Sequence, residues 1–350
     1  MAGPDAGKGE EVTMAPIRLG VIGTGLIWIR THKLILEKLG DAFVPIAFCD
    51  LDEQRRATLT NDFPDAMVVG DYHDLLAMPE VEAVLVLTPI ALNAPTATAA
   101  LLAGKHVIME KPIARSVAEA RELIATARGA GKHLFVTEQM AYRHAEDVLG
   151  EIIAASEIGE LIMWERIHHL EADTGQGPMR YESTPWRKQA DFPLGTMFDG
   201  GIHLIAGLSK VFGIPETVVA TGRKLRPEYG EYDHIAAIFQ YAGGVTGMLS
   251  YSNCLPATHN HFHVIGRAGT IVVEPRRIVV ERLGEPQRVV ELEQEHAYVA
   301  MWHAIVQAFS EQRDAFYTPE KALHDVAILE AVDQAIKTGG RVAVETTGLP

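Results

Sequence analysis

Residues 17–39 constrain the fold of this chain more than any other segment. They begin with a short apolar run rich in β-branched residues, which is followed by the glycine turn 23–25 and by an amphipathic run that reaches Leu39. Strands favour β-branched residues and a surface helix needs apolar residues every three or four positions, so the segment predicts strand, turn and helix. A dinucleotide-binding βαβ unit starts in this order, with the helix N-terminus facing a pyrophosphate.

The glycine turn and the next strand predict how a dinucleotide would bind. Gly23 permits a tight turn, and Gly25 lets a pyrophosphate approach the backbone; the alternative is a plain strand-to-helix turn without a ligand. The second expected strand, 43–49, ends at Asp50, whose carboxylate can accept hydrogen bonds from both ribose hydroxyls of an adenosine. This carboxylate would repel a 2′-phosphate, so the sequence favours NAD over NADP.

Three side chains near this turn affect the details of cofactor binding. Trp28 occupies the position at which a small residue normally lets the helix pack closely on the strand. We therefore expect either a displaced helix or an indole that points sideways. Arg55 and Arg56 follow the acidic residue and keep NADP as an alternative cofactor.

Charge, cysteine content and hydropathy exclude several classes of protein. The net charge of −15 argues against binding to nucleic acid or to anionic membrane surfaces. The two cysteines form no Cys-x-x-Cys motif, which excludes a disulfide scaffold or a cysteine zinc module and fits a reducing cytoplasm. No apolar run reaches the about 18 residues that a membrane span needs. We expect residues 1–15, which lack the apolar core of a signal peptide, to form a flexible tail.

Residues 16–138 continue the alternation of strands and helices, and the 350 residues suffice for two domains. Near-continuous apolar runs at 81–87, 105–109 and 134–137 are typical of strands buried on both faces. We therefore expect an α/β protein whose N-terminal domain is a Rossmann domain with a doubly wound parallel sheet.

Several polar residues follow directly after the ends of these strands. Because ligands of doubly wound sheets bind at the carboxyl ends of the strands, we expect Gly23, Asp50, Thr88 and Lys111 to converge in one crevice. Lys111 precedes a proline, which disfavours helical geometry and holds the residue at the crevice. The alternative for Lys111 is a surface lysine in a turn.

The pattern changes near residue 139, and residues 139–350 predict a second domain for substrate binding and oligomerisation. Short β-rich runs follow one another here with short connections, at 161–169, 217–224, 234–241, 245–252, 259–265, 270–273, 277–282 and 287–292. Such runs predict a large, mostly antiparallel open sheet with helices on one face. The other face would expose apolar surface in a monomer, so we expect a homodimer or homotetramer formed through it.

A second chemical motif lies in an expected helix over 196–211. Asp199 and His203 are four residues apart, so they lie on one face of a helix, where the carboxylate can orient the imidazole. The alternative is an ordinary helical ion pair. Gly200 and Gly201 between them cost about 1 kcal/mol each relative to alanine, which indicates that another group approaches this backbone closely.

These residue types fit the oxidation of a secondary alcohol. A group must take the hydroxyl proton as the hydride leaves the carbon, and histidine titrates near neutral pH. An ammonium group can stabilise the developing alkoxide. Lys111 and His203 can fill these roles if the two domains meet at the crevice.

The sequence resembles the glucose–fructose oxidoreductase / inositol dehydrogenase / rhizopine catabolism (Gfo/Idh/MocA) family from about residue 17 to the C-terminus. The resemblance rests on Ile-Gly-Thr-Gly at 22–25, Thr88-Pro89, Glu110-Lys111-Pro112, Trp186-Arg187, and Asp199 with His203. It implies an N-terminal Rossmann domain, a C-terminal domain built on a large open sheet, and an enzyme that oxidises or reduces a sugar, cyclitol or related compound with NAD(P).

The resemblance also implies roles for particular residues. Lys111, Asp199 and His203 match the catalytic residues of the family. The residues expected to bind the cofactor are Gly23, Thr24, Gly25, Leu26, Ile27, Asp50, Thr88, Pro89, Asn93, Glu110 and Lys111. Besides Trp28, the sequence departs from the family pattern at Asn93, where many members have a histidine, and at Ala206, where an aspartate often follows the catalytic histidine.

Four further side chains are candidates for binding a polyol. Tyr142, Arg143, Trp186 and Arg187 combine aromatic faces, which pack on sugar C–H groups, with guanidinium groups that bind hydroxyls or an acidic substituent. The alternative is packing between the domains.

Alternating histidines at 259, 261 and 263 could bind a metal ion, together with His168 or His169. Because no carboxylate or cysteine nearby in the sequence completes the set, we expect no metal site.

The sequence thus predicts a cytoplasmic NAD(P)-dependent sugar or cyclitol dehydrogenase. Two alternatives remain open: an overall non-redox lyase or hydrolase reaction in which NAD is recycled internally, and a non-catalytic NAD-binding regulator.

Overall fold

The computed structural model describes residues 15–170, 181–293 and 296–345 of the chain. Of the predicted tail, residues 1–14 lie outside the described residues, as do residues 171–180 of the polar segment between the expected strand 161–169 and the expected helix 196–211. Within the described residues, no helix is long and apolar enough to cross a membrane.

The N-terminal part is built on a six-stranded sheet in the order β3-β2-β1-β4-β5-β6, in which every pair is parallel. Its strands are β1 (Ile17–Ile22), β2 (Phe43–Cys49), β3 (Met67–Val69), β4 (Ala83–Val86), β5 (His106–Glu110) and β6 (Leu134–Thr137). Its helices are α1 (Lys33–Lys38), α2 (Glu53–Asp62), α3 (Tyr72–Leu76), α4 (Ile90–Leu102) and α5 (Val117–Ala130). This arrangement confirms the predicted Rossmann domain, because the chain leaves β1 in both directions and creates a switch point between β1 and β4.

The C-terminal part holds a nine-stranded sheet in the order β14-β13-β12-β11-β7-β10-β9-β8-β15. Its strands are β7 (Leu161–His169), β8 (Thr217–Arg223), β9 (His234–Gln240), β10 (Thr246–Ser252), β11 (His261–Gly266), β12 (Gly269–Val273), β13 (Arg277–Arg282), β14 (Arg288–Glu291) and β15 (Val342–Ala343). All neighbours are antiparallel except the parallel pair β7 and β10, so the prediction of a large, mostly antiparallel sheet is confirmed.

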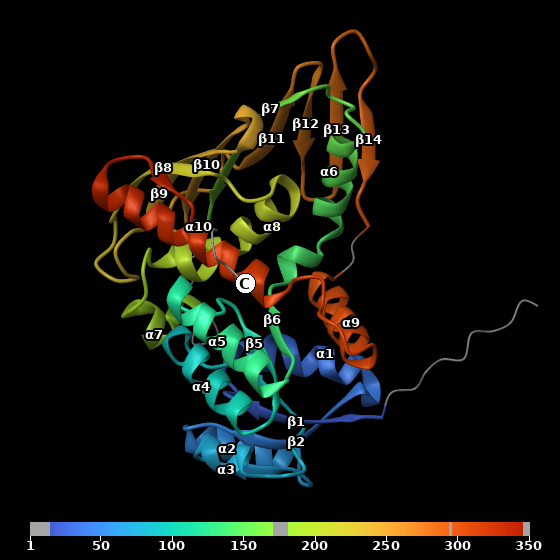
Figure 1. The fold of residues 1–350 in the computed structure, drawn as a ribbon, viewed down its shortest axis with the longest axis vertical. Coiled ribbons are helices and arrows are strands. Elements are labelled where there is room, and N and C mark those ends of the chain that lie inside the picture. Colours follow the sequence, from blue (N-terminus) through green and yellow to red (C-terminus); the bar gives the residue numbers. More distant parts are fainter. Residues whose placement is uncertain (1–14, 171–180, 294–295, 346–350) are drawn as a thin grey trace, which may run out of the picture.

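Helices cover one face of this second sheet, as Figure 1 shows. The helices on that face are α6 (His144–Ala154), α8 (Ile202–Phe212) and α10 (Pro319–Thr338), whereas the short α7 (Pro185–Lys188) lines the cleft described below. Alternate strand residues such as Trp164, Leu249 and Val264 point to the covered face and belong to the same apolar cluster as α8 and α10. Residues of the opposite parity, including Ile238 and Met248, stay exposed.

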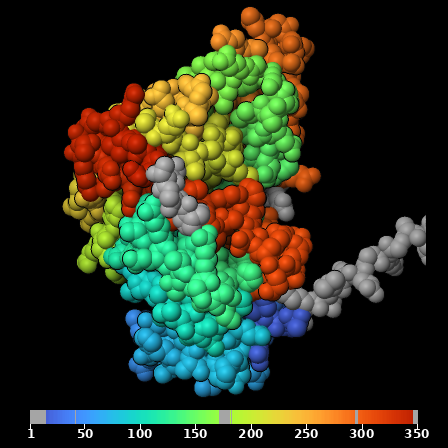
Figure 2. Space-filling model, viewed as in Figure 1, coloured from blue at the N-terminus to red at the C-terminus, as the bar shows by residue number. Residues whose placement is uncertain are grey.

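One helix of the second half packs on the first sheet instead. Helix α9 (Ala297–Ser310) places Trp302, Ile305 and Phe309 in one cluster with apolar residues of β1, β2 and β5, while α4 and α5 cover the other face of that sheet. Figure 2 shows that the orange and red C-terminal helices lie directly against the green and blue N-terminal part. Residues beyond 296 therefore complete both halves of the molecule.

Trp28 shows how the chain accommodates a large residue at a position that is usually small. The first helix opens with a π-helical turn, Trp28–His32, before α1 begins. The indole is buried and packs edge-on against Phe48, with Phe63 close by. The indole thus points into the core beside the strand and does not line the cleft described below.

Candidate functional site

The glycine turn after β1 has the geometry that the sequence predicts. Gly23 has a φ of +89°, and a Cβ atom there would lie 2.7 Å from the carbonyl oxygen of Leu87, so only glycine fits this turn. A Cβ on Gly25 would meet only the Arg55 guanidinium, at 3.9 Å. The backbone at Gly25 is therefore open to a ligand, which fits the close approach of a pyrophosphate.

Asp50 lies beside this turn and is nearly buried. One of its oxygens, Oδ2, accepts hydrogen bonds from the backbone N–H and the hydroxyl of Thr24, both at 2.8 Å, and Arg55 Nη1 lies 3.3 Å away. Burial alone would raise the pKa of Asp50, but the N–H groups of Asp52 and Thr24 lower it below its usual value. The carboxylate is therefore ionised, and it already orders the glycine turn.

A cleft of about 830 Å³ starts at this turn and runs between the two halves of the molecule. Thr24 and Asn93 do not line it, whereas most of the residues predicted to bind the cofactor do: Gly23, Gly25, Leu26, Ile27, Asp50, Thr88, Pro89, Glu110 and Lys111. The volume is typical of small-molecule and cofactor sites.

Asn93 lies behind the lining of this cleft and holds two of its segments together. Its carbonyl oxygen accepts a hydrogen bond from the Thr88 hydroxyl at 2.9 Å, and its amide donates to the backbone oxygens of Glu110, at 3.2 Å, and Pro112, at 3.5 Å. The side chain is buried, so these bonds are protected from water. Asn93 thereby links the turn after β4 to the Glu-Lys-Pro segment after β5.

Glu110 is held by a pair of buried side chains that the sequence did not point to. His32, at the end of the π-helical turn, contacts Glu110 Oε1 through Nε2 at 2.8 Å, and Trp302 Nε1 donates to His32 Nδ1 at 3.2 Å. Because the indole can only donate, Nδ1 accepts and Nε2 carries the proton that His32 donates to Glu110. Burial would raise the pKa of Glu110, but His32 and the Lys111 charge lower it.

Lys111 is held by a second π-helical turn, Met197–Gly201. Its ammonium group donates to the backbone oxygen of Asp199 at 2.7 Å and to Asp199 Oδ1 at 3.1 Å. On the other side of the carboxylate, Arg187 Nε donates to Oδ2 at 2.6 Å. These two cations outweigh the effect of burial and hold the pKa of Asp199 well below its usual range.

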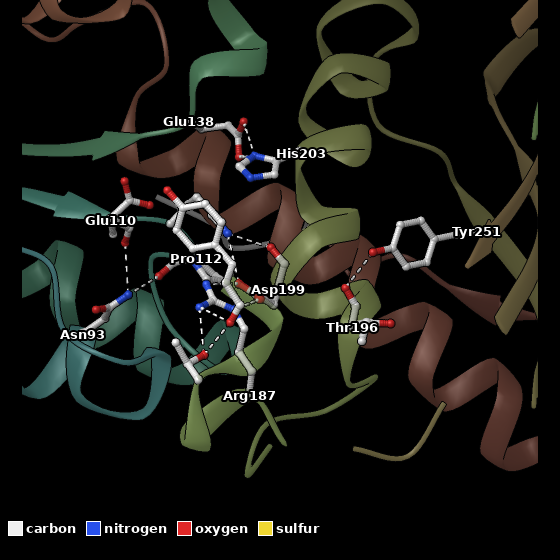
Figure 3. A network of polar contacts seen from close by, with 12 residues as sticks. Asn93, Glu110, Pro112, Glu138, Arg187, Thr196, Asp199, His203 and Tyr251 are labelled. Atoms are coloured by element: carbon white, nitrogen blue, oxygen red, sulfur yellow. Dashed lines mark hydrogen bonds and ion pairs between the residues drawn. The ribbon is translucent and has the colours of Figure 1, made fainter. Parts of the chain in front are cut away.

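The prediction that Asp199 orients His203 is wrong. His203 Nδ1 lies 2.8 Å from both carboxylate oxygens of Glu138, which is fully buried at the end of β6 (Figure 3). The four-residue spacing implies neighbours only in a regular α-helix, and the π-helical turn rotates Asp199 toward Lys111 instead. Glu138 leaves Nε2 as the ring nitrogen that can face a ligand, and His203 lines the cleft.

Glu138 could have been found from the sequence. It follows the apolar run 134–137 directly, so the reasoning that placed Lys111 at a strand end applies to it equally. No comparable signal marks His32, which lies inside a helical pattern and reaches Glu110 only through the fold.

The two glycines between Asp199 and His203 are close to other groups, as expected. A Cβ on Gly200 would lie 2.7 Å from the hydroxyl of Tyr251, which donates to the backbone oxygen of Thr196 at 3.0 Å (Figure 3). A Cβ on Gly201 would overlap the sulfur of Met197. The glycines thus let this turn pack against β10 and keep its shape.

The four residues predicted to bind a polyol separate into two groups. Trp186 and Arg187 line the cleft, and the guanidinium lies 4.0 Å from the indole centre. Tyr142 and Arg143 do not line it. The Tyr142 hydroxyl accepts a hydrogen bond from the Tyr317 backbone at 3.1 Å and so joins two distant segments, whereas Arg143 pairs with Glu146 at 3.3 Å at the start of α6.

Sequence comparison identifies both halves of the chain. Residues 17–138 match the GFO/IDH/MocA model, described as an oxidoreductase family with an NAD-binding Rossmann fold, and residues 148–272 match the C-terminal domain of the same family. The chain belongs to the Gfo/Idh/MocA oxidoreductase family. This confirms the resemblance stated above and, with it, an NAD-binding Rossmann domain.

Named relatives and a solved structure agree with this assignment. A trans-1,2-dihydrobenzene-1,2-diol dehydrogenase of Mus musculus is 30% identical over 75% of this chain and 78% of its own length. The scyllo-inositol 2-dehydrogenase (NADP(+)) of Bacillus subtilis is 24% identical over 73% of this chain and 68% of its own. An oxidoreductase of Thermotoga maritima matches with a TM-score of 0.87 and 26% identity, over 94% of this chain and 98% of that one.

Proposed function

We propose that this protein is an NAD(P)-dependent dehydrogenase that transfers hydride between the nicotinamide and a secondary alcohol or ketone of a sugar, cyclitol or related ring compound. The observation that carries the proposal is the position of Lys111, Asp199 and His203. All three line the same cleft as the dinucleotide-type glycine turn. Relatives that act on an inositol and on a cyclic diol support the choice of substrate class.

The residues of the cleft have different roles in the reaction. When bound, the nicotinamide supplies the hydride acceptor. His203 takes the hydroxyl proton at Nε2, because its Nδ1 faces Glu138. The Lys111 ammonium stabilises the negative charge that develops on the substrate oxygen. Asp199 holds that ammonium through its carboxylate and its backbone oxygen.

NAD is the cofactor that Asp50 favours. Its carboxylate lies at the end of β2, where the ribose of an adenosine binds in Rossmann domains, and its negative charge disfavours a 2′-phosphate. Arg55 lies against the same carboxylate and also lines the cleft, so a rotation of this exposed side chain would provide a partner for a 2′-phosphate. A direct comparison of NAD⁺ and NADP⁺ is therefore part of the test.

The substrate end of the cleft fits a ring compound with an apolar face. The side chains that surround this end are mostly aromatic: Tyr181, Trp186, Phe192, Tyr229, Tyr251 and Tyr298. Aromatic faces pack on C–H groups, while Lys111 and His203 serve a hydroxyl at one edge of such a ring.

The exposed face of the second sheet supports assembly into a homodimer or homotetramer. Val219, Ile238 and Met248 lie opposite one another on adjacent strands of this face, and all three side chains are exposed. A second copy that packs on this row would remove its apolar surface from water. Size-exclusion chromatography with light scattering, on wild type and Ile238→Lys, tests this: the variant should dissociate.

The test of the proposed activity is reduction of NAD⁺ and NADP⁺ by purified protein across sugars, uronates, inositols and cyclic diols. We expect NADH or NADPH with one chemical class, and no turnover in His203→Asn. A protein that releases bound nucleotide on denaturation but forms no reduced cofactor with any compound would contradict the proposal and favour internal recycling. Binding of NAD without chemistry, together with a protein partner, would indicate a regulator.

A further inference from the structure

A cluster of potential metal ligands lies on the exposed face of the second sheet. His261 and His263 point to this face from β11, and Glu165 joins them from β7, directly opposite His263 in the antiparallel register. No carboxylate lies near the alternating histidines in the sequence, as noted above. The fold supplies one from β7, a strand that is about a hundred residues away.

The spacing of the three ligand atoms fits a tetrahedral metal ion. Glu165 Oε1 lies 3.4 Å from His261 Nε2 and 3.2 Å from His263 Nδ1, and all three ligand atoms lie within 4.8 Å of one another. Bonds of about 2.0–2.1 Å to a tetrahedral zinc ion separate neighbouring ligand atoms by about 3.4 Å. Two of the three edges already have this length.

The orientation of His261 gives a second, independent indication. Its Nδ1 lies 3.1 Å from the backbone oxygen of His259, which can only accept, so Nδ1 carries a proton. In a neutral imidazole the lone pair of Nε2 then points at the Glu165 carboxylate, which is repulsive. A metal ion bound to both groups would remove this repulsion. Metal-binding histidines commonly use the other ring nitrogen in this way.

The surroundings of the cluster favour an ion that is partly shielded from water. Ile167, Met248 and Val272 occupy the neighbouring positions of the same sheet face. In a single chain the side chains of the three ligands keep between 29% and 35% of their surface exposed, which leaves room for a fourth ligand. The site faces away from α8, so it is separate from the catalytic cleft.

We propose that Glu165, His261 and His263 bind one divalent transition-metal ion of the zinc type per chain. Two imidazole nitrogens and one carboxylate oxygen suit Zn²⁺, Co²⁺ or Cu²⁺, whereas Mg²⁺ and Ca²⁺ require mostly oxygen ligands.

The test is titration of the full chain, after treatment with a chelator, with Zn²⁺ by isothermal calorimetry at pH 7.5. We expect one ion per chain and no competition from Mg²⁺. Co²⁺ should give the intense visible absorption of a tetrahedral complex. Glu165→Gln and His263→Ala should each weaken Zn²⁺ binding by more than about ten-fold.

A matched control separates this cluster from the other histidines of the chain. His169→Ala removes an imidazole from the same strand and the same sheet face, where it contacts Ser250 rather than a carboxylate. It should bind Zn²⁺ as the wild type does, and turnover of Glu165→Gln should equal that of the wild type, which verifies its fold. Absence of Zn²⁺ binding by the wild type, or equal loss in His169→Ala, would overturn the proposal.

Discussion

The two ends of the cleft are built in different ways. At the cofactor end, Gly23, Gly25 and Asp50 take their positions from the strand that immediately precedes each of them. At the substrate end, Lys111 contacts Asp199 across 88 residues of sequence, and His203 contacts Glu138 across 65. The first end depends on local backbone geometry, and the second depends on how the two halves of the molecule meet.

The groups that stabilise the carboxylate at each end also differ. Asp50 is satisfied mainly by the backbone N–H and hydroxyl of Thr24 in the glycine turn and by the backbone N–H of Asp52. Asp199 is satisfied by two cations that come from different segments, Lys111 and Arg187. Substitutions at the substrate end should therefore affect turnover, while those at the cofactor end should affect binding of the dinucleotide.

The largest effect is expected for Lys111→Met. Loss of the ammonium removes the group that stabilises the alkoxide, and kcat should fall by about 10²–10³-fold. The Kd of NAD, measured by quenching of protein fluorescence, should change far less. Lys188→Met is the control, because this exposed lysine follows Arg187 directly and does not line the cleft. Equal turnover of Lys111→Met and wild type would refute the assigned role.

A smaller effect is expected for Glu138→Gln. The amide cannot hold the imidazole in one orientation as the carboxylate does, so kcat should fall by about 10–100-fold while KM stays nearly constant. Glu138→Asp should restore part of the activity. If Glu138→Gln instead raised KM and left kcat unchanged, Glu138 would not be the group that positions His203.

Two alanine substitutions in the glycine turn should separate folding from binding. Gly23→Ala forces a side chain into a positive-φ turn against Leu87 and should reduce the free energy of unfolding by about 1–3 kcal/mol. The new methyl group of Gly25→Ala meets only the flexible Arg55 guanidinium, so the melting temperature should match that of the wild type. Its methyl group enters the cleft and should weaken NAD binding by about ten-fold, or about 1.4 kcal/mol. Unchanged NAD affinity in Gly25→Ala would place the pyrophosphate elsewhere.

The smallest effect is expected for Asp325→Asn, a substitution behind the substrate end that should change how stability depends on pH. Asp325 on α10 is buried and accepts hydrogen bonds from Ser209 on α8 and from Tyr317, both at 2.6 Å. Burial raises its pKa to about 7, so the folded protein keeps a proton that the unfolded chain releases near pH 4. Stability from this proton is complete below about pH 4 and is lost as the pH rises to about 7.

Urea unfolding at pH 5 and pH 8 tests this loss of stability with rising pH. The wild type should gain stability relative to Asp325→Asn at pH 5 and lose that advantage at pH 8. Parallel pH dependence of the two proteins would show that Asp325 does not titrate in this range.

The same contrast explains what the sequence could predict. The order of strands and helices, the glycine turn and the strand-end positions follow from local patterns, and the structure has them where they were expected. The contact of His203 with Glu138 rather than Asp199 depends on a π-helical turn. Nothing in the sequence around Asp199 distinguishes such a turn from an α-helix. The links from His32 to Glu110 and from Glu165 to His263 join distant segments, which a pattern in one segment cannot reveal.

The most direct test of the proposed hydride transfer uses the substrate found in the panel, deuterated at the carbon that is oxidised. Purified protein is mixed with this compound and NAD⁺, and the deuterium in cofactor and product is followed by mass spectrometry. We expect one deuterium per turnover in the reduced nicotinamide and a ketone product without it. Deuterium that returns to a product carbon, with no accumulation of reduced cofactor, would contradict a net dehydrogenase.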